Sequence, residues 1–596
     1  MAIDTPTSDQ TGIGFDPDAL RGRYRAERDK RVRPDGNAQY EEVAGRFAHF
    51  LDDPYVDPGF ARAPLQDEVE VVVIGGGFGG LLMGAHLRRA GIESIRLIEK
   101  GGDFGGTWYW NRYPGAMCDV ESYIYLPLLE ETGALPSEKY ARAPEILAHS
   151  QAIARTFDLY RDACFQTEVT ALRWDEESAR WIVTTNRGDA MRARFVCMAN
   201  GPLNRPKLPG IPGIESFAGH SFHTSRWDYG YTGGNSDGGL NGLADERVGI
   251  IGTGATAVQC VPHLGEWAKQ LFVFQRTPSS IDVRANRPTD PAWAESLEPG
   301  WQRRRMENFN ILVTGGFQEE DLVADGWTDI IRKLLVIMRD PASPLAAHDI
   351  MKTLELADFQ KMEQIRARVD EIVTNPAAAD ALKPWYRQFC KRPCFHDEYL
   401  QTFNRPNVML VDTGGQGVER LSERGLVANG REYELDCLIY ATGFEVGTSY
   451  TRRAGYDPIG RGGVTLNEHW ADGMRTLHGM QSHGFPNCFI LGAQQAGFTV
   501  NLPHLLDEQS RHIACIVSAA RKRGARTVEV SAAEETSWVE TIIALSGMGR
   551  QFLEECTPGY YNNEGQPGAR NGQDGFYGAG SVAYFRLLEE WRGTLV

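Results

Sequence analysis

The stretch EVEVVVIGGGFGG, Glu68 to Gly80, decides the fold of this 596-residue chain. Its apolar first half predicts a buried strand, and the glycines after it predict a tight turn that opens a helix. The helix continues through LLMGAHLRRAG to Gly91, and SIRLIEK, residues 94–100, predicts a second strand. Strand, helix and strand in this order form a βαβ unit, which places the two strands in one parallel sheet.

A second unit of the same kind begins near Arg247. It reads RVGIIGTGATAVQCVPHLG and continues into LFVFQRTP, residues 271–278. Each unit has a GxGxxG-type turn, formed by Gly75, Gly77 and Gly80 in the first and by Gly252, Gly254 and Ala257 in the second. The first glycine permits the tight turn, the second lets a pyrophosphate approach the backbone, and the third small residue lets helix and strand pack closely. One such pattern is a weak signal, but two copies in the same context predict two dinucleotide-binding folds.

The residue that follows the second strand differs in charge between the two units. Glu99 and Arg276 both lie 24 residues after the first glycine of their unit. A carboxylate accepts hydrogen bonds from a ribose 2′-hydroxyl, whereas an arginine binds a 2′-phosphate with two parallel donors. We therefore expect FAD in the first site and NADPH in the second.

Composition and termini exclude several classes of protein. The net charge of −17 argues against a general nucleic-acid binder. The N-terminal segment MAIDTPTSDQTGIG shows no secretory signal, and no run of about 18 apolar residues predicts a membrane-spanning helix. The ten cysteines are scattered, which favours a reducing cytoplasm over a disulfide framework, and the CxxxC pair Cys390 and Cys394 is interpreted as incidental. We expect no metal site, and the sequence does not predict an oligomeric state.

We expect an α/β fold with two Rossmann-like domains, a helical insertion and an N-terminal extension. Asp16-Pro17 predicts a helix start, and a charged surface helix is expected over residues 18–32. Apolar residues at steps of three and four predict a helix in the insertion, at Phe359, Met362, Ile365, Val369 and Ile372. The expected ranges are 1–64 for the extension, 65–204 and 438–596 for the FAD-binding domain, 205–285 and 387–437 for the NADP-binding domain, and 286–386 for the insertion.

Four further stretches match the motifs of one enzyme family. FAGHSFHTSRWD carries the pattern FxGxxxHxxxW[PD], with Phe217, Gly219, His223, Trp227 and Asp228 in register. The others are GGTWYWNRYPGAMCD, residues 105–119, CKRP before FNRPNV, residues 390–408, and DCLIYATGF, residues 436–444. With these motifs the chain resembles the type I Baeyer–Villiger monooxygenases over about residues 68–445. DCLIYATGF resembles the strand that re-enters the flavin domain.

The resemblance implies a reaction. NADPH reduces FAD, and the reduced flavin reacts with O2 to give a C4a-peroxyflavin that adds to a ketone carbonyl. The adduct rearranges to an ester or lactone. The peroxide anion needs a fixed positive charge, for which Arg392 is the candidate, because a guanidinium stays protonated and has several donors. Asp119 resembles the family carboxylate that positions this arginine.

The resemblance also assigns ligand-binding residues. The implied FAD contacts are Gly75, Gly77, Gly80, Glu99, Gly106, Thr107, Trp108, Asp119, Tyr125 and Val169. The implied NADP contacts are Gly252, Thr253, Gly254, Ala255, Thr256, Ala257, Gln275, Arg276, Lys391 and Arg392. In the fingerprint, His223 is implied to be a structural and coupling residue and not a catalytic base.

The chain departs from the family near its C-terminus. Many members place a tryptophan in a mobile loop over NADP+, whereas CTPGYYNNEGQPG, residues 556–568, has Tyr560 and Tyr561 instead. AGFTVNLP resembles a loop that lines the substrate pocket, which makes Phe498, Thr499, Val500 and Tyr560 the substrate-pocket candidates. The long leader and the CTPGYYNNEG loop resemble the subgroup acting on large cyclic ketones and steroids.

Other interpretations remain open from sequence. An N- or S-oxygenase, an uncoupled NADPH oxidase and a nucleotide-binding module without activity share the two glycine turns. A disulfide reductase is disfavoured because no cysteine pair has the spacing for it. Asp119 and Arg392 could form an interdomain salt bridge without a catalytic role, and Trp108 could be an ordinary core aromatic.

Overall fold

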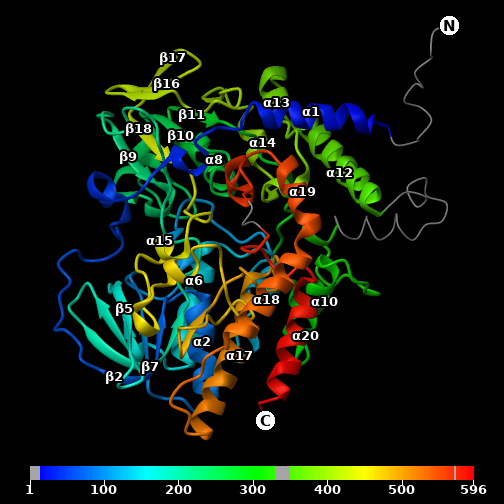
Figure 1. Ribbon diagram of the computed structural model, residues 1–596. Helices are drawn as coiled ribbons and strands as arrows, with labels where there is room; N and C mark the ends of the chain where they lie inside the picture. The colour runs from blue at the N-terminus through cyan, green and yellow to red at the C-terminus, as the bar shows by residue number, and fades with distance from the viewer. Residues whose placement is uncertain (1–13, 330–349, 569–571, 596) are drawn as a thin grey trace.

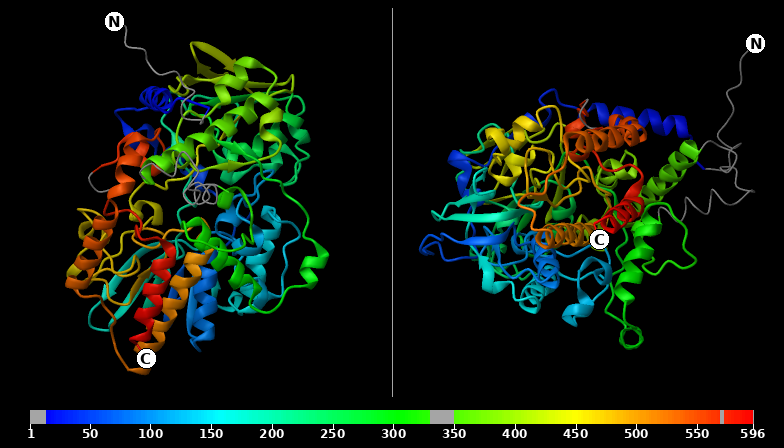
Figure 2. Two further views of the ribbon diagram at one scale, coloured as in Figure 1. Left: turned by 90° about the vertical axis from the view of Figure 1, so that its right-hand side faces the viewer. Right: turned by 60° about the horizontal axis from the view of Figure 1, so that its bottom comes forward.

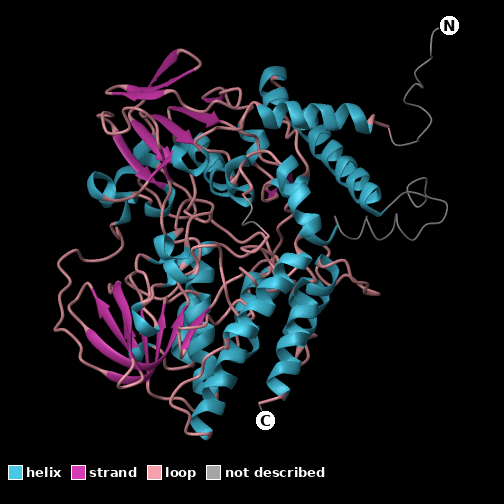
Figure 3. Ribbon diagram, in the orientation of Figure 1, coloured by secondary structure: helices cyan, strands magenta, loops and turns pink. Residues whose placement is uncertain are grey.

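Two sheets at different ends of the molecule organise the fold. The computed structural model describes residues 14–329, 350–568 and 572–595, and Figures 1 and 3 show the strands gathered in a lower and an upper group. Long helices cover the lower group in all views, including the two of Figure 2. This arrangement confirms the α/β class with two Rossmann-like domains.

The first sheet has seven strands and contains the opening stretch of sequence. Its path is β4 (Ala163–Cys164), β3 (Ile95–Ile98), β2 (Glu68–Ile74), β7 (Ala190–Met198), β6 (Arg180–Thr185) and β5 (Val169–Asp175), with β19 (Cys488–Ile490) on β7. β2 is parallel to both β3 and β7. Val71 and Val73 of β2 are buried in one hydrophobic cluster, and Val72 and Ile74 in another. A parallel strand buried on both faces explains why VVVI is an uninterrupted apolar run.

Three helices pack in succession beside this sheet, with the first of them in contact with β2. They are α2 (Phe78–Arg89), α17 (Leu502–Lys522) and α20 (Gly580–Gly593), and α17 contacts both of the others. The C-terminal part of the chain therefore completes the first domain.

The second sheet is fully parallel, in the order β14 (Val408–Asp412), β11 (Gln270–Gln275), β10 (Arg247–Ile251), β18 (Cys437–Tyr440) and β9 (His220–His223). The helix α8 (Ala255–Trp267) follows β10, as the glycine pattern predicts. β18 corrects one expected boundary: the chain does not leave this domain at residue 437, because β18 pairs with both β10 and β9. A small antiparallel sheet precedes β18 in the chain and consists of β15 (Arg420–Ser422), β16 (Gly425–Ala428) and β17 (Arg431–Glu434).

The leader packs along the body. The α1 helix (Pro17–Asp29) begins with Pro17 at its first turn, and the Asp16 side chain accepts hydrogen bonds from two amides. It ends three residues before the expected Val32; the chain soon reaches Pro34, before which helical backbone is disfavoured. β1 (Tyr40–Glu41) then pairs with β8 (Leu208–Pro209).

The insertion is helical where it is described. Its helices are α9 (Pro291–Glu295), α10 (Trp301–Val313), α12 (Ile350–Ile372) and α13 (Pro376–Leu382), and residues 330–349 lie outside the described part. The expected apolar face of α12 is confirmed, because Phe359, Met362, Ile365 and Val369 are buried. The insertion begins and ends close together, since β12 (Ile281–Asp282) pairs with β13 (Cys394–Phe395).

Short helices fill the connections. They are α3 (Thr107–Trp110), α4 (Ser122–Tyr125), α5 (Leu129–Thr132), α6 (Ala143–Thr156), α7 (Tyr229–Thr232), α14 (Tyr399–Thr402), α15 (Tyr450–Ala454), α16 (Leu466–His469), α18 (Ala532–Leu545) and α19 (Gly547–Glu555), with 3-10 turns that include Gly36–Gln39 and Tyr560–Gly565. None of the helices within the described ranges is both long and apolar enough to cross a membrane.

One disulfide was not expected from the sequence. Cys390 and Cys556 are bonded, with their Cα atoms 5.0 Å apart and a separation of 166 positions in the chain. Cys394 is a free, buried thiol, so the CxxxC spacing indeed does not mark a pair. The bond joins the end of α19 to the residue just before Lys391, and no local spacing announces a partner at this separation.

Candidate active site

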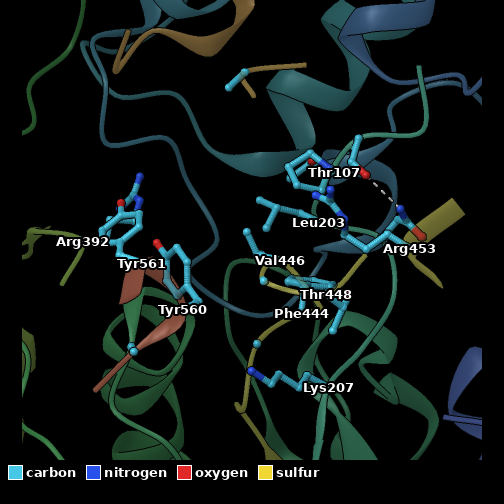
Figure 4. A pocket seen from close by; sticks show the side chains of 18 of the residues that line it. Thr107, Leu203, Lys207, Arg392, Phe444, Val446, Thr448, Arg453, Tyr560 and Tyr561 are labelled. Carbon is cyan, nitrogen blue, oxygen red and sulfur yellow. Dashed lines mark hydrogen bonds between the residues drawn. The ribbon is translucent and has the colours of Figure 1, made fainter. Parts of the chain in front are cut away.

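A large cavity is lined by residues of both domains. Its volume is about 2220 Å³, and both glycine turns and the Lys391–Arg392 pair line it. Pockets for one small ligand occupy roughly 300–1,000 Å³, so this cavity has room for two dinucleotides and a further molecule. Figure 4 shows part of its wall, with Arg392 beside the Tyr560 and Tyr561 side chains and Lys207 on another segment.

The first glycines of the two turns have nearly the same backbone conformation. Gly75 has φ 115° and Gly252 has φ 117°, backbone angles that residues other than glycine rarely adopt. A Cβ on Gly75 would lie 2.3 Å from the Ala199 carbonyl oxygen, and one on Gly252 would lie 2.4 Å from that of Ala441. The two turns are therefore structural equivalents, each closed against the neighbouring strand.

The second glycines open each turn toward the cavity. Gly77 and Gly254 cap the N-termini of α2 and α8 and line the cavity. A Cβ on Gly254 would meet no atom within 4 Å, so this surface is open to a ligand. Ala255 and Thr256 also line the cavity, and the amides of a helix N-terminus bind pyrophosphate. The residues present fit a dinucleotide at each turn.

The third positions act in packing, as expected. A Cβ on Gly80 would lie 1.8 Å from the Gly75 carbonyl oxygen, and Ala257 is fully buried. Thr253 is largely committed as well, since its hydroxyl donates to the Thr277 carbonyl at 2.7 Å. These residues shape the turns; Thr253 also lines the cavity, and the expected ligand contacts of the three residues stay predictions.

Glu99 lies directly after β3 and is buried. Its carboxylate accepts hydrogen bonds from the amides of Gly76 and Gly101, each at 2.6 Å. Burial raises the pKa of Glu99 above its ordinary value, and the two amides oppose that shift. The carboxylate borders the cavity and retains free lone pairs, which is the arrangement that a ribose hydroxyl needs.

Arg276 lies directly after β11, and two remote side chains hold its guanidinium. Nη1 donates to Gln39 Oε1 at 2.6 Å, and Nη2 donates to Glu564 Oε2 at 3.1 Å. Lys391 lines the same region, and burial together with the nearby Arg276 lowers the pKa of Lys391 to about 8. The Gln275 side chain is buried and donates to the Ala381 carbonyl, but it also lines the cavity and its Oε1 has no hydrogen-bond partner among the described residues, so its expected contact with the nucleotide stays a prediction.

Arg392 and Asp119 form an ion pair between the two halves of the cavity wall. Both guanidinium Nη atoms donate to the carboxylate, Nη2 to Oδ1 at 2.7 Å. The Asp119 side chain is 10% exposed and that of Arg392 is 35% exposed. Burial opposes ionisation of Asp119, but the adjacent guanidinium outweighs it and keeps the pKa of Asp119 below its ordinary value. Trp327 donates to the Asp119 carbonyl at 2.7 Å and fixes the backbone here.

The other expected flavin contacts lie around the first turn. Gly106, Thr107, Trp108, Tyr125 and Val169 all border the cavity. Trp108 is buried, and its indole donates to the Tyr125 hydroxyl at 3.1 Å. The two aromatics therefore orient one another at the wall.

The fingerprint segment connects the two sheets. His223 is fully buried; its Nδ1 accepts from the Ser225 amide, so Nε2 carries the proton and donates to the Gly443 carbonyl at 3.0 Å. Burial, helped by Arg226, lowers the pKa of His223 to about 3, which keeps the ring neutral. Gly443 follows β18, where the chain returns to the first domain, so His223 fixes this crossing.

The rest of the fingerprint supports the same connection. Trp227 is buried and donates to the Thr232 hydroxyl at 3.0 Å. Asp228 caps α7 through the Tyr231 amide. Gly219 is required because a Cβ would lie 2.4 Å from the Phe217 ring. These contacts are structural and none of them faces the cavity.

The expected substrate-pocket residues do line the cavity. Phe498 is exposed and stacks on Phe576, with ring centroids 4.6 Å apart. Thr499 is buried and its hydroxyl has no hydrogen-bond partner within the described residues. Val500 packs against the buried cluster that contains Val120 and Ile124, and Tyr560 lies near Arg392.

Sequence reasoning missed three residues of the second site. Lys207 Nζ lies 3.5 Å from Glu564 Oε1, and Glu564 also binds Arg276. Gln39 comes from the leader. No motif or periodicity marks these residues, because each acts through a partner more than 200 positions away.

Comparisons with known proteins agree with this geometry. Residues 72–308 match the family model described as pyridine nucleotide-disulphide oxidoreductase. The chain is 59% identical over 580 residues to neopentalenolactone D synthase of Streptomyces avermitilis, covering 97% of this chain and 98% of that protein. It is 53% identical over 584 residues to a Baeyer–Villiger monooxygenase of Streptomyces coelicolor, with 97% and 96% covered.

Solved structures give the same relation. The polycyclic ketone monooxygenase of Thermothelomyces thermophila superposes with a TM-score of 0.90 at 41% identity, covering 97% of each chain. A steroid monooxygenase bound to NADP superposes with a TM-score of 0.71 at 30% identity, covering 88% of this chain and 98% of that one. Identity of this level over nearly the whole length shows that this chain belongs to the Baeyer–Villiger monooxygenases.

Proposed function

We propose that this chain oxidises a bulky or cyclic ketone to an ester or lactone with NADPH and O2. The observation that carries the proposal is the Arg392–Asp119 pair, which borders one cavity together with both dinucleotide turns. The names of the relatives, which include a polycyclic ketone monooxygenase and a lactone synthase, support the same substrate class.

The two nucleotide sites differ in charge, as expected for a ribose 2′-hydroxyl in FAD and a 2′-phosphate in NADPH. Glu99 and the first turn would hold FAD, and the second turn with Arg276 and Lys391 would hold NADPH. These two cofactors supply the electrons and the activation of O2 when bound. We place the return to the FAD-binding domain after Tyr440 and keep the other expected domain limits.

Arg392 would stabilise negative charge that develops on oxygen as the ketone reacts. A guanidinium that is already oriented by two hydrogen bonds needs no rearrangement at that moment, which is the basis of electrostatic catalysis. Asp119 holds this orientation, and because Arg392 is partly exposed, its remaining donors can face the cavity.

Substrate binding would fall to the apolar mouth of the cavity. Phe498 and Phe576 present a stacked, exposed pair there, and Val500 and Tyr560 continue the wall. An exposed aromatic pair at the mouth of a large cavity suits a bulky apolar ketone. We also propose a cytoplasmic location, because eight of the ten cysteines are free thiols and Cys390–Cys556 is the one bonded pair among the described residues.

Product analysis tests the function. The purified protein, loaded with FAD, is incubated with NADPH and ketones of graded size, and with a thioether. We expect ester or lactone from at least one cyclic ketone, in proportion to the NADPH consumed. Sulfoxide without lactone would reject the ketone reaction, and stoichiometric H2O2 without product would indicate an oxidase.

A further inference from the structure

A buried carboxylate lies among the cations of the proposed NADPH site. Glu564 is 3% exposed, and its Oε2 accepts from Arg276 Nη2 at 3.1 Å while its Oε1 lies 3.5 Å from Lys207 Nζ. Burial opposes ionisation, but the two cations outweigh it and keep the pKa of Glu564 below its ordinary value. The group is therefore an anion at neutral pH.

The cations around Glu564 exceed it in charge. Lys391 also lines this region and has no hydrogen bond or ion pair to any other described residue, and its pKa is lowered by burial and by Arg276. Three cations around one carboxylate form a site with affinity for a second anion. Glu564 and a nucleotide phosphate would thus share the same donors.

The backbone that presents Glu564 is unusual. Asn563 and Glu564 both have positive φ, 52° and 56°, in a region that residues other than glycine seldom adopt. Such a conformation costs roughly 1–3 kcal/mol per residue and persists where surrounding contacts impose it. Asn562 supplies some of these contacts, because its side chain donates to the carbonyls of Cys556 and Thr557.

The same segment is covalently fixed beside the site. Cys556 is bonded to Cys390, whose neighbour in the chain is Lys391. Glu564 lies eight residues after the bonded cysteine, so the disulfide keeps its carboxylate at a high local concentration near the cations. Tyr560, between them, reaches toward Arg392.

We propose that Glu564 sets the preference between NADPH and NADH, because its carboxylate competes with the coenzyme 2′-phosphate for Arg276 and Lys207. This inference rests on the proposed NADPH site. Glu564 is not needed merely to orient Arg276, since Gln39 holds the other Nη atom. The charge of Glu564 therefore weakens phosphate binding, and NADPH binds against this internal competitor.

The test uses Glu564→Gln, which keeps a carbonyl acceptor of the same reach and removes the charge. Binding of 2′-AMP and 5′-AMP to the FAD-loaded protein is measured by titration calorimetry. We expect 2′-AMP to bind about tenfold more tightly to the variant, a change of about 1.4 kcal/mol, and 5′-AMP to bind equally well. Glu555→Gln is the control. Glu555 is exposed on α19, so this substitution removes the same charge from the protein surface, away from the cations.

A second pair of variants separates competition from misfolding. Cys556→Ser releases the tether and should tighten 2′-AMP binding severalfold, but only while Glu564 is present. Cys556→Ser combined with Glu564→Gln should bind 2′-AMP no better than Glu564→Gln alone, because both changes remove one competitor. Additive gains would contradict the proposal.

The remaining outcomes are decisive. Weaker or unchanged 2′-AMP binding in Glu564→Gln would overturn the inference and leave the NADPH site intact. If the unmodified protein does not prefer 2′-AMP to 5′-AMP, the assigned phosphate site is wrong and the inference falls with it. Neither result depends on whether a ketone is oxidised.

Discussion

Replacement of Arg392 by alanine should separate coenzyme oxidation from oxygen transfer. Arg392 donates two hydrogen bonds to Asp119 and lines the cavity, where we propose that its other donors act. If these donors stabilise negative charge on oxygen, their loss affects the oxygenation step alone. Reduction of the flavin by saturating NADPH should continue within about threefold of the unmodified rate.

The magnitude follows from the kind of interaction lost. One preorganised donor at a developing oxyanion contributes a factor of about 10²–10³, or about 2.7–4 kcal/mol. We expect lactone formation to fall by this factor, with NADPH consumption diverted to H2O2. The Asp119–Arg392 pair also contributes to stability, but Arg392 is 35% exposed, so solvent limits this to about 1 kcal/mol.

The assay compares lactone, H2O2 and NADPH in the same reaction. Arg387→Ala is a matched control, because Arg387 faces Asp358 at 3.6 Å and does not border the cavity. Thermal unfolding verifies that both variants remain folded. Full lactone yield from Arg392→Ala would refute the catalytic role and favour an ion pair that only joins the two domains.

Three other predictions concern the coenzyme and the disulfide. Arg276→Ala should raise KM for NADPH far more than for NADH, since a charge-assisted phosphate contact contributes roughly 1.5–3 kcal/mol; equal effects would remove Arg276 from the phosphate site. The lowered pKa of Lys391, about 8, means that the side chain is charged below this pH and neutral above it, so 2′-AMP binding should weaken as pH rises through about 8. Lys391→Arg should remove this pH dependence, because arginine stays protonated. A flat pH profile of 2′-AMP binding in the unmodified protein would contradict the role assigned to Lys391. Thiol titration of unfolded, unreduced protein should detect eight cysteines and ten after reduction, whereas ten before reduction would exclude the Cys390–Cys556 bond.

The parts of the fold that sequence predicted are those with local signals. The glycine turns require a particular backbone at Gly75 and Gly252, and the strands beside them are buried on both faces, so turn residues and apolar runs mark them directly. The apolar face of α12 was predictable for the same reason, since its period follows from helix geometry. The pairing of β18 with β10 and β9 was not predictable, because the order of strands in a sheet depends on contacts that are distant in sequence.

The candidate site divides in the same way. Glu99 and Arg276 could be identified because each follows its strand at a fixed distance from a motif. The contact expected from Gln275 stays a prediction: its side chain donates to the Ala381 carbonyl, a partner that the sequence does not indicate, and it still lines the cavity. Glu564 and the Cys390–Cys556 bond depend on a segment that folds back over hundreds of residues, for which one sequence contains no signal.

The leader has a mechanical consequence for the whole enzyme. It contacts α12 through Tyr24, the second domain through β1, and the first domain where Tyr109 donates to Asp53 at 2.6 Å. A segment anchored at three bodies restricts how far they can swing apart. A protease cut between Arg33 and Asp53 should therefore allow larger relative motion of the domains, although it removes no ligand-binding group from the first turn. Truncated forms of this chain should be more flexible as well as shorter.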